Sequence, residues 1–344
     1  MKCSRCKQTA VVALPSHNSG FCRDCYLQFF TGQVEKGIRR QKLFTHEDRI
    51  LVALSGGKDS LALMLELSLQ GYTVTGLHID LAIPGSSPAA RKAVEGFCAT
   101  HSFPLIVREM AAEGLAIPEV KKRIKRPICS MCGKIKRHYF NKAALEHGFT
   151  ALATGHNLDD EVARLFSNTL RWDVSYLADQ GPLLEERDLF IASSRTPDTP
   201  EQAGFIGQNP EPMPCEAHAR SAEPEAGKGV SGGRFARKVK PLWRLSEFET
   251  ANYAFLQGIE NHYFPCPYSR GATFTYYKTL WAELEERMPG RKISFYQGFL
   301  ERGRGAFAAI ETGETELVAP CTACGYPTST GVCGVCRLKG YMAE

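Results

Sequence analysis

The sequence predicts an α/β fold, a doubly wound parallel sheet with a small zinc-binding module at each end of the chain. Three observations lead to this prediction. Apolar segments of strand length alternate with helical segments between residues 49 and 170, a glycine-rich loop joins the first strand to the first helix, and both ends carry paired C-x-x-C spacings. The 344 residues suffice for one large core with small appended modules.

Composition narrows the class of protein. No run approaches the roughly 20 apolar residues of a membrane span, and the N-terminus "MKCSRCKQTA" lacks the apolar stretch of a signal peptide. We therefore expect a cytoplasmic protein without membrane segments. In a reducing compartment, its 13 cysteines are expected to be metal ligands or catalytic groups rather than disulfides. The net charge of +5 is compatible with a nucleic-acid partner.

The first module is defined by four cysteines in "CSRC" and "CRDC", which are Cys3, Cys6, Cys22 and Cys25. Two cysteines three residues apart on a tight turn can reach one ion, and two such turns complete the tetrahedral thiolate site of structural zinc. We predict that zinc holds this segment together, because the segment is too short for a core of its own.

The central segment alternates strictly between strands and helices. The expected strands are 49–55, 73–80, 103–110 and 150–157, and the expected helices are 59–70, 88–101, 133–147 and 159–170. Such alternation is typical of a parallel, doubly wound sheet. Ligands of these sheets bind beyond the carboxyl ends of the strands.

The loop "SGGKDS", Ser55 to Ser60, lies between the first strand and the first helix. Two glycines allow a tight turn close to an oxyanion, and the helix N-terminus adds unpaired N–H groups. Lys58 adds positive charge. We predict a phosphate-binding loop, which differs from the P-loop because there is no G-x-x-x-x-G-K.

A second motif, "GHNLDDE", runs from Gly155 to Glu161 at the end of the fourth strand. Asp159 and Asp160 stand at a helix start, where aspartate commonly caps. The functional alternative is a magnesium ligand opposite the nucleotide phosphates. We favour the second role for Asp160, with Asp159 as the cap.

The alternation of strands and helices stops between residues 193 and 236, which are rich in Pro, Gly, Ser, Ala and Glu. We predict a flexible surface insertion, in which Cys215 is an incidental thiol. From "FARKVKPLW" onward helical periodicity returns.

The stretch "PICSMCGKIKR", residues 127–137, holds Cys129 and Cys132. A zinc ion bound by this pair would need two more ligands. One candidate is Cys266, whose local backbone is fixed because it stands between two prolines. A buried core thiol is the alternative for Cys266. The pair itself fits a thioredoxin-like redox pair or a persulfide-forming cysteine as well.

The C-terminal segment repeats the arrangement of the first. Its pairs "CTAC" and "CGVC" are Cys321, Cys324, Cys333 and Cys336. Glycines punctuate the turns, and we predict a second structural zinc ion.

Together these motifs resemble the TtuA-type tRNA 2-thiouridine synthetases (tRNA-5-methyluridine 2-sulfurtransferases) of the N-type ATP pyrophosphatase, or PP-loop, superfamily. The resemblance covers nearly the whole chain and rests on both quartets with "SGGKDS", "LHIDLAIPG", "RPICSMCGKIKR", "ATGHNLDDE", "NTLRWDVSYL", "KVKPLW" and "CPYSRGAT". The chain departs from the family at its insertion, which is longer than the pattern needs, and at Cys25, where some members carry histidine.

The resemblance implies a HUP-like fold and a set of site residues. ATP is bound by the loop and its neighbours, namely Ala53, Ser55, Gly56, Gly57, Lys58, Asp59, Ser60, Ile79, Lys136 and Gly155. Lys136 and Asp160 act near the phosphates. Cys129, Cys132 and Cys266 hold a [4Fe-4S] cluster, and three protein thiolates leave one iron open for a hydrosulfide.

The implied organisation has five parts. They are an N-terminal zinc finger (1–30), a PP-loop core (31–192), the insertion (193–236), the remainder of the catalytic domain with the third cluster cysteine (237–315) and a C-terminal zinc ribbon (316–344).

The implied reaction is sulfur transfer to C2 of a tRNA uridine. ATP adenylates the C2 oxygen, so that AMP leaves in its place, and Mg²⁺ with the loop neutralises the released pyrophosphate. Sulfide from the cluster then replaces the oxygen. Catalysis is therefore assigned to Cys129, Cys132, Cys266, Lys136 and Asp160.

The implied partners are tRNA, a ubiquitin-like sulfur carrier with a C-terminal thiocarboxylate or another sulfide source, and a second copy of the chain in a homodimer. Two basic runs, 36–42 and 121–126, are expected to meet the RNA backbone. Alternatives are another PP-loop reaction, such as cytidine 2-thiolation or lysidine synthesis, and an inactive zinc-ribbon adaptor that binds tRNA. The sequence leaves open whether the T-loop or the wobble uridine is modified.

Overall fold

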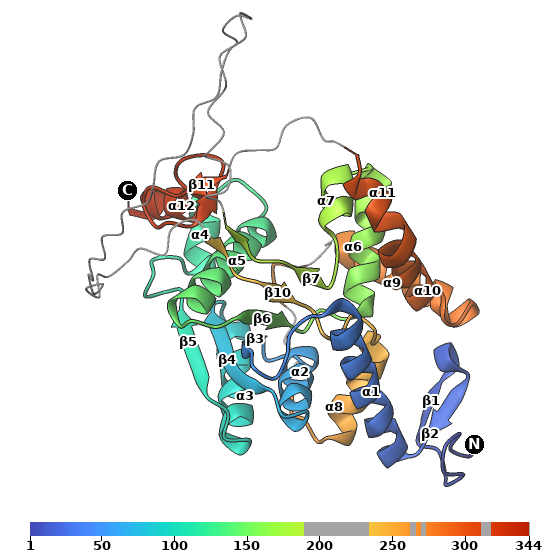
Figure 1. The fold of residues 1–344 in the computed structure, drawn as a ribbon. Coiled ribbons are helices and arrows are strands. Elements are labelled where there is room, and N and C mark those ends of the chain that lie inside the picture. Colours follow the sequence, from blue (N-terminus) through green and yellow to red (C-terminus); the bar gives the residue numbers. More distant parts are fainter. Residues whose placement is uncertain (189–233, 262–265, 270–272, 311–317, 344) are drawn as a thin grey trace, which may run out of the picture.

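A computed structural model describes residues 1–188, 234–261, 266–269, 273–310 and 318–343 (Figure 1). Its centre is a six-stranded sheet with the order β5-β4-β3-β6-β10-β7. Most of the predicted insertion, including Cys215, lies outside the described residues. Within those residues, no helix is long and apolar enough to cross a membrane.

Four neighbouring parallel strands, from the edge strand β5 to β6, form one side of the sheet, as predicted. They are β3 (Arg49–Leu54), β4 (Thr73–Asp80), β5 (Leu105–Glu109) and β6 (Ala151–Thr154). The connecting helices are α2 (Lys58–Leu69), α3 (Ser86–Thr100), α4 (Ile117–Arg123) and α5 (Ile128–Glu146). Helix α5 begins five residues before the predicted start of 133, so that both Cys129 and Cys132 lie on its first turns.

Side chains of β3 alternate between two apolar layers, which explains its continuous apolar run. Ile50, Val52 and Leu54 face α2, α1 (Arg23–Gln41) and α8 (Glu247–Leu256). Leu51 and Ala53 face α5, where Ala143 and Ala144 pack on them. Figure 1 shows the sheet between these two helical layers.

The far edge of the sheet corrects two predictions. β10 (Lys238–Val239) pairs parallel with β6, but β7 (Leu183–Leu184) pairs antiparallel with β10, so the sheet is not wholly parallel. The last residues of the predicted insertion form a strand, β9 (Arg234–Phe235), and the segment after it begins with β10, not with a helix. β9 pairs with β8 (Arg187–Asp188). Strand β10 has only two residues, begins with Lys238 and is followed by Lys240. It is therefore too short and too charged to show the alternating pattern of a strand.

A second group of helices lies beside this edge (Figure 1). It consists of α6 (Leu158–Arg171), α7 (Val174–Asp179), α9 (Thr273–Arg287), α10 (Arg291–Gly298), a π-helical turn (Phe299–Gly303) and α11 (Arg304–Ala308). Helix α6 packs on α9 and α10, and α11 packs on α7.

The two termini form small separate elements. The N-terminal hairpin consists of β1 (Val12–Leu14), a 3-10 turn (Pro15–His17) and β2 (Ser19–Phe21). The C-terminal module has β11 (Ala319–Pro320), β12 (Pro327–Thr328) and α12 (Gly334–Ala343). Helix α12 packs on α4 and α5, on the opposite side of Figure 1 from the hairpin.

Candidate active site and metal centres

The glycine-rich loop turns directly from β3 into α2. The Ser60 hydroxyl accepts the backbone N–H of Ser55 at 3.1 Å and donates to the Gly57 carbonyl at 2.9 Å, which closes the loop on itself. Gly56 has φ +80°, and a Cβ there would lie 2.9 Å from the Ala90 carbonyl oxygen. The loop therefore requires glycine at this position and leaves the first N–H groups of α2 available to a ligand.

The predicted ATP-site residues come together at the carboxyl edge of the sheet. Ala53 and Ser55 lie at the end of β3, Ile79 near the end of β4 and Gly155 just after β6. A Cβ on Gly155 would lie 2.9 Å from the backbone of Asp59 and Ser60. The end of β6 therefore touches the loop, and only glycine allows this approach.

A network of charges crosses this edge from the loop to α9. Lys58 Nζ lies 3.1 Å from Asp59 Oδ2 and 3.0 Å from Glu247 Oε1, while Lys278 Nζ lies 3.3 Å from Glu247 Oε2 and 2.7 Å from Asp160 Oδ1. Burial alone would lower the pKa of both lysines, but the facing carboxylates outweigh burial and raise it. Burial raises the pKa of Asp59. The network thus places two cations beside the predicted phosphate site.

Glu247 and Lys278 were missed by sequence analysis. They stand on α8 and α9, far along the chain from the loop, and no local motif marks them. Their approach is set by the packing of α8 on α2 and of α9 on α6.

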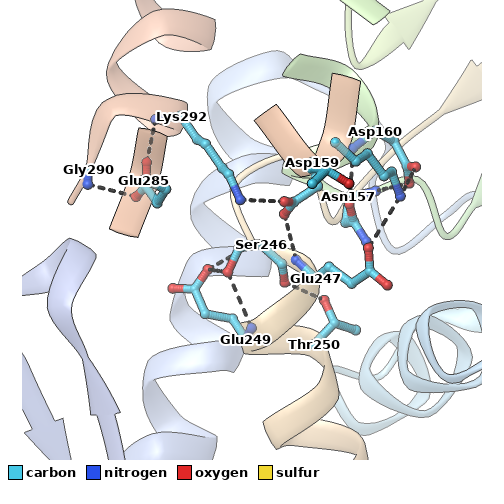
Figure 2. Close-up of polar contacts among 12 residues, drawn as sticks. Asn157, Asp159, Asp160, Ser246, Glu247, Glu249, Thr250, Glu285, Gly290 and Lys292 are labelled. Atoms are coloured by element: carbon cyan, nitrogen blue, oxygen red, sulfur yellow. Dashed lines mark hydrogen bonds and ion pairs between the residues drawn. The ribbon is translucent and has the colours of Figure 1, made fainter. Parts of the chain in front are cut away.

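The structure corrects the capping role of Asp159 (Figure 2). Asn157 caps α6 by accepting the Asp160 N–H at 3.2 Å, and Asp160 Oδ2 accepts the Asn157 N–H at 3.1 Å. Asp159 is buried and accepts instead from the Glu247 N–H at 2.7 Å and from Lys292 Nζ at 2.5 Å. Asp159 therefore joins α6 to α8 and α10, while Asp160 caps α6 and faces Lys278.

The three predicted cluster cysteines line one cavity of about 260 Å³ at the start of α5. Its walls are Ile83, Ile117, Ile128, Cys129, Cys132, Gly133, Lys136, Cys266 and Tyr268. Cys129 Sγ donates to the Tyr268 carbonyl at 3.3 Å. Burial raises the pKa of Cys132, against the opposing effect of Lys136. Lys136 therefore lies with the cysteines.

This cavity suits a group larger than one ion. In the described part of the chain, the sets of three or more potential ligand atoms that lie within 4.8 Å of one another are the two terminal quartets. The cavity cysteines are spaced more widely around an apolar space, and three thiolates around such a space fit an iron–sulfur cluster better than tetrahedral zinc.

The terminal quartets do have the geometry of zinc sites. All four sulfurs of Cys3, Cys6, Cys22 and Cys25 converge, as do those of Cys321, Cys324, Cys333 and Cys336. Backbone N–H groups point at the sulfurs: that of Cys333 donates to Cys321 Sγ at 3.1 Å, and that of Cys336 to Cys333 Sγ at 3.4 Å. In the N-terminal quartet, hydrogen bonding to the Cys6 backbone lowers the pKa of Cys3 to about 6. The lowered pKa favours the thiolate form of Cys3, which is the form that binds a cation.

Comparisons with known proteins agree with these features. Residues 2–27 match the family model of the 2-thiouridine synthetase TtuA N-terminal LIM domain, and residues 30–173 match the PP-loop domain. The chain is 36% identical to the tRNA-5-methyluridine(54) 2-sulfurtransferase of Thermus thermophilus over 98% of this chain and 91% of that protein. The protein of the same name from Pyrococcus horikoshii is 35% identical over 100% of this chain and 95% of its own length.

A solved structure has the same fold. It is the U34-tRNA thiolase NcsA from Methanococcus maripaludis with its [4Fe-4S] cluster, at a TM-score of 0.66 and 21% identity, covering 99% of this chain and 95% of that one. The identities over nearly the full chain, with the matching PP-loop domain, show that this protein belongs to the TtuA-type family of tRNA 2-sulfurtransferases.

Proposed function

We propose that this enzyme replaces the C2 oxygen of uridine 54 in tRNA with sulfur, using ATP and releasing AMP and pyrophosphate. The observation that carries the proposal is the shared location of two sites. The cysteine cavity is lined by Ile83, which follows β4, and by the first turns of α5, so it opens at the same sheet edge as the glycine-rich loop. Uridine 54 is chosen because relatives at 33–36% identity are named for that position.

The nucleotide is assigned to the loop edge. Ser55 to Ser60 bind the phosphates, with Ala53, Ile79 and Gly155 around the rest of ATP. Asp160 would hold Mg²⁺, since its carboxylate pairs with Lys278 in the charge network that extends to Lys58 of the loop. Lys58 and Lys278 neutralise the charge that develops on pyrophosphate. Lys136, on the wall of the cysteine cavity, stabilises charge on the α-phosphate as the uridine oxygen attacks it.

The metals are assigned to the three cysteine sets. Cys129, Cys132 and Cys266 would hold a [4Fe-4S] cluster, which supplies an iron with an open position for sulfide. Ile83, Ile117 and Ile128 make part of the wall of this space apolar. The two terminal quartets would each hold structural Zn²⁺. Three further proposals are carried over from the family. The sulfur source is a thiocarboxylated ubiquitin-like carrier or free sulfide, the protein is a homodimer, and its location is cytoplasmic.

The tRNA backbone is assigned to the basic runs. Residues 121–123, 125 and 126 are exposed and lead directly into α5, and Lys121 lies 4.5 Å from the ring centre of Tyr268 on the cavity wall. Phosphate contacts here would guide the RNA to the cavity.

The main test is anaerobic purification followed by analysis of iron, sulfide and zinc, with thiolation of tRNA transcripts measured by nucleoside mass spectrometry. We expect about four irons, two zinc ions, and 2-thiouridine at position 54 but not in a transcript lacking that uridine. Cys266→Ala should lose the iron, whereas Cys98→Ala, a buried free thiol away from the cavity, should keep it. A colourless wild-type protein with a third zinc would refute the cluster.

The phosphate roles have their own test. Asp160→Ala and Lys136→Ala should retain iron and zinc but lose most tRNA-dependent pyrophosphate release, by about 10²-fold or more for groups that act on the transition state. Wild-type rates in either variant would show that the assigned role is wrong.

A further inference from the structure

Strand β10, which lies between β6 and the edge strand β7, begins with Lys238 and is followed by Lys240. In the pairing of β10 with β6, Lys238 stands opposite Leu152 and Val239 opposite Ala153. Because Ala153 and Val239 pack in the α2 layer and Leu152 packs in the α5 layer, Lys238 and Lys240 project on the α5 side. Lys240 is buried and paired with Glu161 of α6 at 2.8 Å. Lys238 is the half-buried member of the two.

Two arginines from the neighbouring helices approach Lys238. Arg164 lies nearly one helical turn after Glu161, so it is on the same side of α6. Arg137 lies one turn before Asn141, whose side chain bonds the Arg234 carbonyl at 3.1 Å and the Ala236 N–H at 2.7 Å, just ahead of β10. Burial, with repulsion from Lys240, Arg164 and Arg137, lowers the pKa of Lys238 to about 7.

The basic cluster of Arg137, Arg164 and Lys238 borders the cysteine cavity. A Cβ on Gly133, which lines the cavity, would lie 3.2 Å from Arg137 Nη1. The Arg137 guanidinium therefore lies against Gly133 of the cavity wall. Both arginines are exposed.

These three cations lack an anionic partner in the part of the chain that the structure describes, where their side chains make no hydrogen bond or ion pair. The carboxylate of Glu161 acts on Lys238, but Lys240 and the Tyr296 hydroxyl already bond to it, at 2.8 and 2.7 Å. By contrast, Lys58, Lys278 and Lys292 each face a carboxylate. Three clustered cations without a counter-charge favour binding of an anion from outside.

We propose that the basic cluster binds a backbone phosphate of the RNA, beside the uridine whose base enters the cysteine cavity. This inference rests on the proposed function. A base in the cavity brings its own phosphates to the cavity border, where Arg137 lies, and arginine forks match phosphodiester oxygens. ATP is the less suitable anion, because the glycine-rich loop leads into α2 on the opposite face of the sheet from Lys238.

The test compares RNA and nucleotide affinity in the full-length, metal-loaded protein. Arg164→Gln and Lys238→Gln should each weaken binding of a tRNA transcript about tenfold and reduce the slope of log affinity against log salt by about one. ATP affinity should not change. Arg164→Lys, which keeps the charge, should restore most of the RNA affinity, and Lys92→Gln, at an exposed lysine on α3, is the control.

Three outcomes would overturn the inference: unchanged RNA affinity in both variants, a loss of ATP affinity with RNA affinity retained, or an equal loss in Lys92→Gln. Failure of the proposed function is a separate result, since the wild-type protein itself would then neither bind nor thiolate the transcript.

Discussion

The two terminal cysteine quartets share one ligand pattern but rest on different parts of the molecule. Cys3, Cys22 and Cys25 belong to the main apolar core, together with aromatic side chains of α1. Cys321 and Cys333 belong to a second apolar cluster, built on α5 and α12, against which Cys132 and Cys266 of the cavity also pack. One quartet therefore supports the core, and the other supports the helix that carries the cavity cysteines.

The polar contacts follow the same division. On the N-terminal side, Glu249 of α8 is buried and accepts from His17 at 2.9 Å, and the Tyr26 hydroxyl donates to its carbonyl at 2.6 Å. On the C-terminal side, Lys339 of α12 and Tyr139 of α5 share the half-exposed Glu113, at 2.6 and 2.9 Å. The two quartets thus have different tasks according to the surface on which they pack.

The largest expected effect separates the quartets directly. Cys333→Ser should lose one zinc and, because α12 supports α5, should also lower iron content and thiolation by about tenfold or more, as changes around metal ligands commonly do. Cys22→Ser should lose one zinc, melt at a lower temperature and keep its iron in the folded fraction. Metal analysis and nucleoside mass spectrometry on both variants measure this. Equal loss of iron in the two would show that the quartets are equivalent.

A smaller effect concerns the polar contacts. The buried Glu249 carboxylate accepts hydrogen bonds from His17 and from the Ser246 N–H and hydroxyl, at 2.9, 2.6 and 2.7 Å. Glu249→Gln removes its charge and weakens these bonds, and should lower the free energy of unfolding by about 2 kcal/mol. The matched change Glu113→Gln breaks a more exposed pair and should cost less than about 1 kcal/mol. Chemical denaturation measures both. A larger cost for Glu113→Gln would reverse the comparison.

Much of this arrangement could be predicted from sequence, for physical reasons. Strands buried on both faces carry continuous apolar runs, so β3 was evident from "RILVAL", and quartets and glycine loops are local patterns. β10 was missed because a lysine begins it and another follows it. The start of α5 was missed because Pro127 and the cysteine pair have no helical signature.

Other features depend on tertiary packing. Asn157, Asp159 and Asp160 all have side chains that cap helices, and the structure alone shows that Asn157 and Asp160 cap α6 while Asp159 bonds the first turn of α8. In the same way, Glu247 reaches Lys58 of the loop, and Lys278 reaches Glu247, only because α8 packs on α2 and α9 packs on α6. Position in one helix carries no information about such partners.

The smallest expected effect is a pH dependence on the C-terminal side of the comparison. His138 of α5 is buried against Tyr326 of the C-terminal module, with ring centres 4.7 Å apart, and burial, with the nearby Lys142 and Lys339, lowers its pKa to about 4 against the opposing Glu113. Because the folded-state pKa is below the ordinary value of about 6.5, the stability contribution is complete above pH 6.5 and is lost as the pH falls toward 4.

Between pH 7 and pH 5 the wild-type protein should therefore lose about 1–2 kcal/mol through this histidine. In His138→Gln that part of the loss should vanish, while the exposed His147→Gln near the end of the same helix should behave as wild type. Hydrogen exchange localises the effect: acid should increase the opening of residues 318–343 in the wild type more than in His138→Gln, with no such difference at residues 1–25. If acid opens both ends equally in both proteins, His138 does not stabilise the contact of the C-terminal module with α5.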